Sequence, residues 1–194
     1  MTEPMQKRVK RLIDAGAALA GLLVFTPVVL VCMAAIRLTS AGPALLRQAR
    51  VGQGERPFIC LKLRTMRADT PLAPTHKTGA DAVTPLGHHL RRLKLDELPQ
   101  LWNVLRGEMS LVGPRPCLPS QVELIEERRR RGVNALRPGI TGVAQVAGID
   151  MSDPVRLAEV DARYIAEQST ATDLRLIWAT IRGAGRGDRV RASG

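Results

Sequence analysis

The sequence has few aromatic residues and only three cysteines, and both shortages exclude whole classes of protein. Aromatic side chains make up 3% of its 194 residues, so the core must be mainly aliphatic, and the stacking platforms that bind single-stranded nucleic acid are scarce. The cysteines are far apart, without the CxxC or Cys/His spacing of a zinc site. We therefore expect Cys32, Cys60 and Cys117 to be reduced, as in a domain that faces the cytosol.

Familiar catalytic motifs are missing as well. The sequence contains no Walker A loop, no GxSxG or HExxH motif and no GxGxxG fingerprint. Acidic residues are in the minority, because 18 Asp and Glu stand against 29 Lys and Arg, which gives a formal net charge of +11. Such a balance predicts a polyanionic partner, either nucleic acid, anionic lipid or a phosphate-bearing substrate, and charge alone does not choose among them.

One long segment, from Ala15 to Ile36, lacks charge altogether. Its 22 residues would form a helix of about 33 Å, enough to cross a bilayer. A cleaved signal peptide is disfavoured by this length and by Arg37, which follows without a small-x-small cleavage site. Because both flanks are basic, a single crossing would place one of them on the wrong side of the membrane. The flanking residues are Lys7, Arg8, Lys10 and Arg11 before the segment, and Arg37, Arg47 and Arg50 after it.

Pro27, preceded by Thr26, stands near the middle of this segment. Proline removes the hydrogen bond to the carbonyl of Leu23, so the helix should bend there, with the Thr26 hydroxyl partly satisfying a freed carbonyl. We predict a re-entrant helix-break-helix over residues 1–40, which enters the membrane and leaves it on the same side. A kinked helix that spans the membrane stays open as the alternative.

The rest of the chain is predicted as one compact domain over residues 41–183, of the α+β class but mostly helical. A flexible Gly/Arg-rich tail over residues 184–194 should follow it. A Gly-x-Gly between two short apolar runs predicts a hairpin turn near residues 50–54. Hydrophobic periodicity and turn signals predict helices over residues 86–95, 121–131, 154–167 and 172–182.

Two of these helices allow two interpretations each. The run from Arg128 to Arg131 suits the dipole at a helix C-terminus and would equally suit contact with anionic lipid. The last helix carries a single apolar face, which belongs either to the core or to a membrane-facing surface. That face consists of Leu174, Ile177, Trp178 and Ile181.

Adjacent carboxylates, Asp96 and Glu97, stand among arginines and proline-rigid turns. Asp96 is placed to begin a helix with Pro99 in its first turn, so the helix N-terminus and nearby cations would hold Asp96 ionised and attract a phosphate. An ionised carboxylate can attack phosphorus when positive charge neutralises the repelling oxygens, and Mg²⁺ commonly supplies that charge. A helix cap at Asp96 is the alternative, and the local features alone favour the cap.

A series of short strings then follows in one order from about residue 8 to residue 182. They are residues 10–11 with Asp14, residues 42–43 with Gln48, Arg50 and Gly52, residues 62–66, 95–101, 103–105 and 113–116, residues 137–142 with Gln145, Asp161 with Tyr164, and Asp173. Together they resemble the bacterial sugar transferase family of monotopic phosphoglycosyl transferases. Each string is modestly specific, but so many in one order leave little room for coincidence.

This resemblance implies an enzyme that transfers a sugar 1-phosphate from a UDP-sugar to a polyprenyl phosphate such as undecaprenyl phosphate, the first membrane step of bacterial glycan assembly. Asp96 matches the family's nucleophile, which would take up the phospho-sugar covalently and release UMP before the acceptor receives it. Glu97 matches the carboxylate that binds Mg²⁺. The positions implied to bind substrate are Lys62, Arg64, Arg91, Arg115, Arg137 and Gln145.

The resemblance also implies a monotopic protein on the cytoplasmic face of the bacterial inner membrane, in contact with membrane lipids and without nucleic acid as a partner. The family bends its membrane helix at a Ser-Pro pair, where this chain has Thr26-Pro27. Ile149 stands where the family commonly has an arginine, which puts the sugar and nucleotide contacts in question. The sequence leaves open the sugar, the pathway, homo-oligomer formation and the roles of Asp161 and Asp173.

Two other functions are compatible with parts of the pattern. A basic membrane-attached protein that binds nucleic acid or anionic lipid, without catalysis, would explain the net charge and the uncharged segment. It would not explain Asp96 and Glu97 between arginine-bearing loops. A polytopic phosphoglycosyl transferase would need more than the one apolar segment that the sequence contains.

Overall fold

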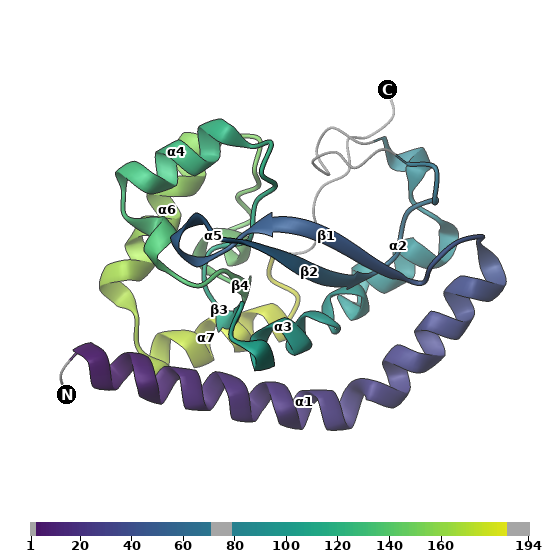
Figure 1. Ribbon diagram of the computed structural model, residues 1–194, viewed down its shortest axis with the longest axis horizontal. Coiled ribbons are helices and arrows are strands. Elements are labelled where there is room, and N and C mark those ends of the chain that lie inside the picture. Colours follow the sequence, from purple (N-terminus) through teal and green to yellow (C-terminus); the bar gives the residue numbers. More distant parts are fainter. Residues whose placement is uncertain (1–2, 71–78, 186–194) are drawn as a thin grey trace.

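A long N-terminal helix, α1 (Glu3–Thr39), lies along one side of the molecule, and the rest of the chain packs against it (Figure 1). The computed structural model describes residues 3–70 and 79–185. Within these ranges the fold is α+β and mostly helical, as predicted. The helices after α1 are α2 (Pro85–Arg92), α3 (Gln100–Arg106), α4 (Val122–Arg130), α5 (Val143–Val146), α6 (Pro154–Glu167) and α7 (Thr170–Ile181). The strands are β1 (Leu45–Val51), β2 (Pro57–Leu63), β3 (Ser110–Val112) and β4 (Gly139–Thr141), and single 3₁₀ turns are η1 (Gln53–Glu55), η3 (Ala80–Ala82), η4 (Leu95–Glu97) and η5 (Val133–Ala135).

Helix α1 bends but is not interrupted. It remains helical through Pro27 and extends beyond the uncharged segment at both ends. The predicted break is therefore wrong, because α1 is one continuous helix, but Figure 1 shows that its axis changes direction beyond the middle, so a bend is present. The Thr26 hydroxyl donates to the carbonyl of Leu22 at 2.5 Å, rather than to the Leu23 carbonyl that the proline deprives of its partner.

The first half of α1 packs on α3 through small residues. Ala18 is fully buried there, and a Cβ added to Gly21 would lie 2.9 Å from the side chain of Leu101. Glycine at this position therefore allows the two helices to approach closely. Arg11 strengthens the contact, since its guanidinium donates to the carbonyl oxygens of Val104 and Leu105 at 2.6 and 2.7 Å, near the end of α3.

The second half of α1 returns to the same domain. Ile36 is buried in a cluster with Leu63 and Leu90, which belong to β2 and α2. On its other side α1 exposes many large apolar residues, and Met5–Thr39 is long and apolar enough to cross a membrane, by length and composition. The most exposed of them are Leu12, Leu23, Val24, Leu30, Val31 and Leu38. One long helix is thus fixed to the domain at both ends and leaves its apolar side uncovered.

The hairpin predicted at the Gly-x-Gly is confirmed. Strands β1 and β2 pair antiparallel, from Leu45 opposite Leu63 to Val51 opposite Pro57. The turn between them is joined to α4, because Arg129 donates to both carboxylate oxygens of Glu55 at 2.7 and 2.6 Å. The hairpin therefore bridges the molecule between α2 and α4 (Figure 1).

Strands β3 and β4 bring the two proline-rigid loops side by side. They pair in parallel, with Ser110 opposite Gly139 and Val112 opposite Thr141. Just after β3 the two backbones come so close that a Cβ on Gly113 would lie 2.3 Å from the carbonyl oxygen of Arg137. Only glycine fits there, and the loop that follows it is held against the start of β4.

The arginine run at the end of α4 forms ion pairs within the protein. Figure 1 shows α4 on the opposite side of the domain from α1, which favours the ion-pair interpretation over contact with lipid. The pairs are Arg128–Asp161, Arg129–Glu55, Arg130–Glu127, Arg131–Glu127 and Arg131–Glu159.

Helix α7 lies beside the first part of α1 (Figure 1), and most of its apolar face is exposed. Leu174, Trp178 and Ile181 are 61%, 56% and 70% exposed, whereas Ile177 packs against the core. The position of these side chains next to α1 favours a membrane-facing surface. Beyond α7, Ala184 and Gly185 of the predicted tail lie against the domain, and residues 186–194 are outside the described part of the chain.

Candidate active site

A cavity of about 560 Å³ opens between the hairpin, the loop after β3 and the segment from β4 to α7. Its volume is in the range of sites that bind small molecules. Asp96 and Glu97 both line it. So do five of the six residues predicted to bind substrate, namely Lys62, Arg64, Arg91, Arg115 and Gln145.

The carboxylates are presented by a tight 3₁₀ turn and not by the start of an α-helix. α2 ends at Arg92, and Lys94 then adopts a left-handed conformation with φ of 56°, which sends the chain into η4. Left-handed conformations are unfavourable for side chains larger than glycine and tend to occur where function requires them. Helix α3 begins only at Gln100, with Pro99 before it, so Asp96 caps no helix and the cap interpretation is wrong.

Cations from three elements surround the two carboxylates. Glu97 Oε1 lies 3.2 Å from Lys62 Nζ of β2 and 3.0 Å from Arg115 Nη2 of the loop after β3. Arg91 of α2 is oriented by Thr65, whose hydroxyl accepts from its Nε at 2.8 Å. Its Nη1 is buried and has no hydrogen-bond partner among the described residues, so it is available for an acceptor such as a phosphate oxygen.

Asp96 is only 9% exposed, and this burial changes its acidity. Burial, together with the charge of Glu97, raises the pKa of the Asp96 carboxyl to about 6, while Lys62, Arg91 and Arg115 oppose the rise. The cations near Asp96 were expected to hold it ionised; they do favour the anion, but burial outweighs them. At neutral pH the carboxyl is still mainly ionised, and as a poorly solvated anion it is suited to attack.

The loop that carries Arg115 is held by two other arginines, whose part in the site the sequence did not reveal. Arg128 donates to the carbonyl of Arg115 at 2.9 Å and to Asp161 Oδ2 at 2.6 and 3.1 Å. Arg50 donates to the carbonyl of Pro116 at 3.0 Å. Asp161 thus serves as the ion-pair partner of a buried arginine, one of the roles that the sequence left open.

The remaining predicted residues are less directly connected to the carboxylates. Arg64 lines the cavity, but its Nη1 donates to the carbonyl of Ala41 and its Nη2 to that of Ser40, at 3.0 Å, so it joins β2 to the end of α1. Arg137 is not among the residues that line the cavity; it lies just before β4, and its buried Nε has no hydrogen-bond partner among the described residues. The structure thus gives Arg64 a structural contact and separates Arg137 from the cavity.

Gln145 and Ile149 lie together in the wall formed by α5 and the loop after it. Gln145 Nε2 donates to the carbonyl of Ile140 at 2.8 Å, and its buried Oε1 has no partner within residues 3–70 and 79–185. Ile149 makes this part of the wall aliphatic, together with Met151 and Leu157.

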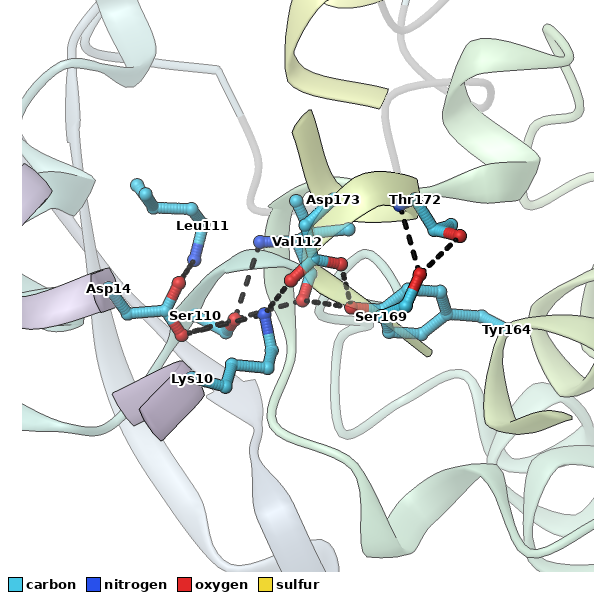
Figure 2. Close-up of polar contacts among 9 residues, drawn as sticks. All are labelled: Lys10, Asp14, Ser110, Leu111, Val112, Tyr164, Ser169, Thr172 and Asp173. Carbon is cyan, nitrogen blue, oxygen red and sulfur yellow. Dashed lines mark hydrogen bonds and ion pairs between the residues drawn. The ribbon is translucent and has the colours of Figure 1, made fainter. Parts of the chain in front are cut away.

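A second polar cluster, outside the cavity, fixes α1 to the domain. Figure 2 shows Lys10 between two carboxylates: its Nζ lies 2.6 Å from Asp173 Oδ2 and 3.6 Å from Asp14 Oδ2. Ser110 donates to Asp14 at 2.7 Å, and the Tyr164 hydroxyl donates to Asp173. Asp173 is therefore an ion-pair and hydrogen-bond partner. This cluster connects α1, β3, α6 and α7 in a single network.

The adjacent carboxylates agree with the chemistry of a Mg²⁺ site. Mg²⁺ is usually held by one or two carboxylates, with water and substrate phosphates as its other ligands. Asp96 and Glu97 repel one another strongly enough to contribute to the raised pKa of Asp96, and a divalent cation would relieve that repulsion. Within the described residues no group of three or more His, Cys, Asp or Glu side chains could hold a metal ion, so Mg²⁺ bound here would need ligands besides these two carboxylates.

Comparison with known proteins agrees with this geometry. The bacterial sugar transferase family matches residues 5–186. The chain is 42% identical, over 181 residues, to the UDP-glucose:undecaprenyl-phosphate glucose-1-phosphate transferase of Caulobacter vibrioides, with 89% of this chain and 68% of that protein covered. It is 36% identical, over 196 residues, to the exopolysaccharide production protein ExoY of Rhizobium meliloti, with 92% and 86% covered. The UDP-glucose:undecaprenyl-phosphate glucose-1-phosphate transferase of Escherichia coli is 37% identical over 188 residues, with 91% of this chain but only 40% of that protein covered. The chain belongs to the bacterial sugar transferase family and is a phosphoglycosyl transferase.

Proposed function

We propose that the protein transfers a sugar 1-phosphate from a UDP-sugar to undecaprenyl phosphate, or a similar polyprenyl phosphate, through a covalent intermediate on Asp96. The observation that carries the proposal is the position of this carboxylate, buried in a cavity among cations from Lys62, Arg91 and Arg115. The names of the Caulobacter and Escherichia relatives support the donor and acceptor classes.

In the first step an Asp96 carboxylate oxygen attacks the phosphorus that bears the sugar. A new P–O bond forms to Asp96, the P–O bond to the bridging oxygen breaks, and UMP leaves with that electron pair. Lys62, Arg91 and Arg115 are placed to offset the negative charge of the phosphate oxygens during the attack. Removing any one of them should slow this step more than it weakens donor binding.

In the second step a phosphate oxygen of the polyprenyl phosphate attacks the same phosphorus. The acyl-phosphate bond breaks, Asp96 regains its carboxylate, and the product is a polyprenyl-diphosphate sugar. Arg115 is kept in place through both steps by Arg128, which holds its carbonyl at 2.9 Å. Mg²⁺, held by Glu97 with the neighbouring Asp96, would supply additional charge neutralisation at the diphosphate.

The proposal places the protein on the cytoplasmic face of the bacterial inner membrane, with α1 as a re-entrant element. A spanning helix would carry one end about 30 Å away from the domain. Instead Lys10 and Arg11 contact the domain near one end of α1, and Ser40 contacts Arg64 at the other. Both ends on one side support the same-side topology, and the uncovered apolar side of α1 would face the lipid.

The covalent step is tested by isotope exchange without any lipid acceptor. With Mg²⁺ and a panel of UDP-sugars, the protein should exchange labelled UMP into the donor, and mass spectrometry should find a phospho-sugar on the peptide that contains Asp96. Asp96→Asn should show neither signal, because an amide cannot form the acyl phosphate. Transfer to lipid without exchange or adduct would refute the covalent mechanism while keeping the overall reaction.

Topology is tested separately with cysteines placed at the two ends of α1. In a Cys32→Ala background, Lys7→Cys and Arg37→Cys should both resist a membrane-impermeant maleimide in intact spheroplasts and react after lysis. Reaction of one of them from outside would establish a spanning helix.

A further inference from the structure

The last described residues of the chain, Gly183, Ala184 and Gly185, form a short segment that we name the C-terminal strap. It leaves α7 through a capping turn, in which Gly183 has φ of 95° and the N–H of Ala184 donates to the carbonyl of Ala179 at 2.9 Å. The strap then runs along the cavity, whose lining includes Ala184 and Gly185. A segment predicted to be a loose tail is therefore part of the wall of the active site.

One contact of the strap lies on the wall beside Gln145. Gly185 has φ of 62°, and a Cβ added there would lie 2.3 Å from the carbonyl oxygen of Gln145 and 2.9 Å from its carbonyl carbon. These are contacts with backbone, which cannot move aside as a flexible side chain could. The strap and α5 thus pack together in a way that requires glycine at this position.

The other contact of the strap lies next to the catalytic turn. Lys94 Nζ donates to the carbonyl of Ala184 at 2.8 Å. Lys94 is the left-handed residue that sends the chain into η4, two positions before Asp96. A non-glycine residue keeps such a conformation only when its surroundings fix it. Backbone bonds from Lys94 to Arg91 and from Glu97 to Lys94 hold the turn, and the Lys94 side chain connects it to the strap.

We infer that the C-terminal strap is a working part of the active site, in which the Lys94–Ala184 bond positions the catalytic turn and the Gly185–Gln145 contact holds the strap in the cavity wall. Lys94 is on this account a positioning residue, which acts through the backbone that presents Asp96. The inference rests on the proposed function, because its readout is the exchange of UMP into a UDP-sugar. A displacement of about 1 Å at a reacting group can cost a hundredfold in rate, so small changes in the strap should be measurable.

The first test compares two glycines that share a backbone conformation. Gly185 and Gly54 both have φ of 62°, so an alanine meets the same left-handed strain at either position, but nothing lies within 4 Å of the Cβ at Gly54. Both variants should lose thermal stability through this strain, and Gly185→Ala should lose more, because its Cβ also meets the Gln145 backbone. Gly185→Ala should in addition lower the exchange rate by about tenfold to a hundredfold, and Gly54→Ala should not.

The second test concerns Lys94 and separates positioning from substrate binding. Lys94→Met should lower kcat for exchange with little change in the KM for the UDP-sugar, and Lys94→Arg, which retains a donor, should recover part of the rate. A rise in KM at constant kcat would mean that Lys94 binds substrate, and would overturn the positioning role. If the wild-type protein exchanges UMP while Gly185→Ala matches Gly54→Ala, the inference about the strap is wrong and the proposed function stands. A wild-type protein that exchanges no UMP with any donor contradicts the covalent mechanism instead.

Discussion

Breaking the buried ion pair between Arg128 and Asp161 should destabilise the protein more than any surface change. The two side chains are 5% and 3% exposed and meet at 2.6 Å. In Asp161→Leu the arginine charge stays buried without its partner, and in Arg128→Met the carboxylate does. Removing one member of such a pair costs about 3–5 kcal/mol. For a chain of this size, where 1 kcal/mol shifts Tm by about 2–4 °C, Tm should fall by roughly 6–20 °C.

The double variant Asp161→Leu/Arg128→Met should behave differently in stability and in activity. Apolar residues of similar volume often replace a buried ion pair at no net cost, so the double variant should regain most of the lost Tm. It should not regain the exchange rate, because the Arg115 carbonyl still lacks the donor that Arg128 provides. The bond of Arg128 to Asp161 would then govern stability, and its bond to the Arg115 carbonyl would govern activity.

The assay is thermal unfolding of purified protein in one detergent, followed by UMP exchange on the same preparations. Arg130→Met, which removes an arginine 69% exposed from the same helix, is the matched control and should shift Tm by no more than about 2 °C. An Asp161→Leu variant as stable as that control would refute the reasoning about burial. A double variant with full exchange activity would refute the role of Arg128 in positioning Arg115.

Three further predictions follow from other contacts. Gly21→Leu should lower the free energy of unfolding by about 1–3 kcal/mol, because the larger side chain overpacks against α3. Gly16→Leu should be tolerated, because nothing lies within 4 Å of a Cβ there, and the Tm values of the two variants test the difference. Lys10→Met should cost about 1–3 kcal/mol, because it leaves the half-buried Asp173 carboxylate without its cation; unchanged Tm and unchanged proteolysis of α1 would contradict this. The folded-state pKa of Asp96 is raised to about 6, so between about pH 4 and 6 the folded protein binds more protons than the unfolded chain. Without Mg²⁺, the wild type should therefore lose stability relative to Asp96→Asn as the pH rises through that window. Parallel Tm profiles of these two proteins would show that Asp96 has an ordinary pKa.

The sequence predicted those features of the fold that depend on local signals. The hairpin turn at Gly52 and Gly54, the helix over residues 154–167 and the helical class all follow from residue spacing, and the structure contains them. It also predicted, through family motifs, that Asp96 and Glu97 would meet Lys62, Arg91 and Arg115 in one place. Such predictions succeed because each depends on a few neighbouring residues or on a string that is specific as a unit.

Features that depend on distant contacts were not predictable in this way. The rise in the pKa of Asp96 to about 6 was not predicted, because it comes mainly from burial, and burial is a property of the complete fold. The pairing of Arg128 with Asp161 joins residues 33 positions apart, and nothing in either local sequence distinguishes it from a surface charge. The contacts of Ala184 and Gly185 likewise depend on the path of the chain after α7, which composition alone described as loose.

The distribution of charge explains how a buried carboxylate can act as the proposed nucleophile. Seven Lys or Arg residues and four Asp or Glu residues line the cavity, so its potential is positive and attracts a diphosphate. The α4 arginines contribute little to this field, because carboxylates neutralise them, among them Asp161 in the cavity wall. The low solvation that raises the pKa of Asp96 would also keep water away from an acyl phosphate formed there. Burial therefore reduces the ionised fraction of Asp96 below neutral pH. It would also protect the acyl-phosphate intermediate from hydrolysis until the lipid phosphate binds.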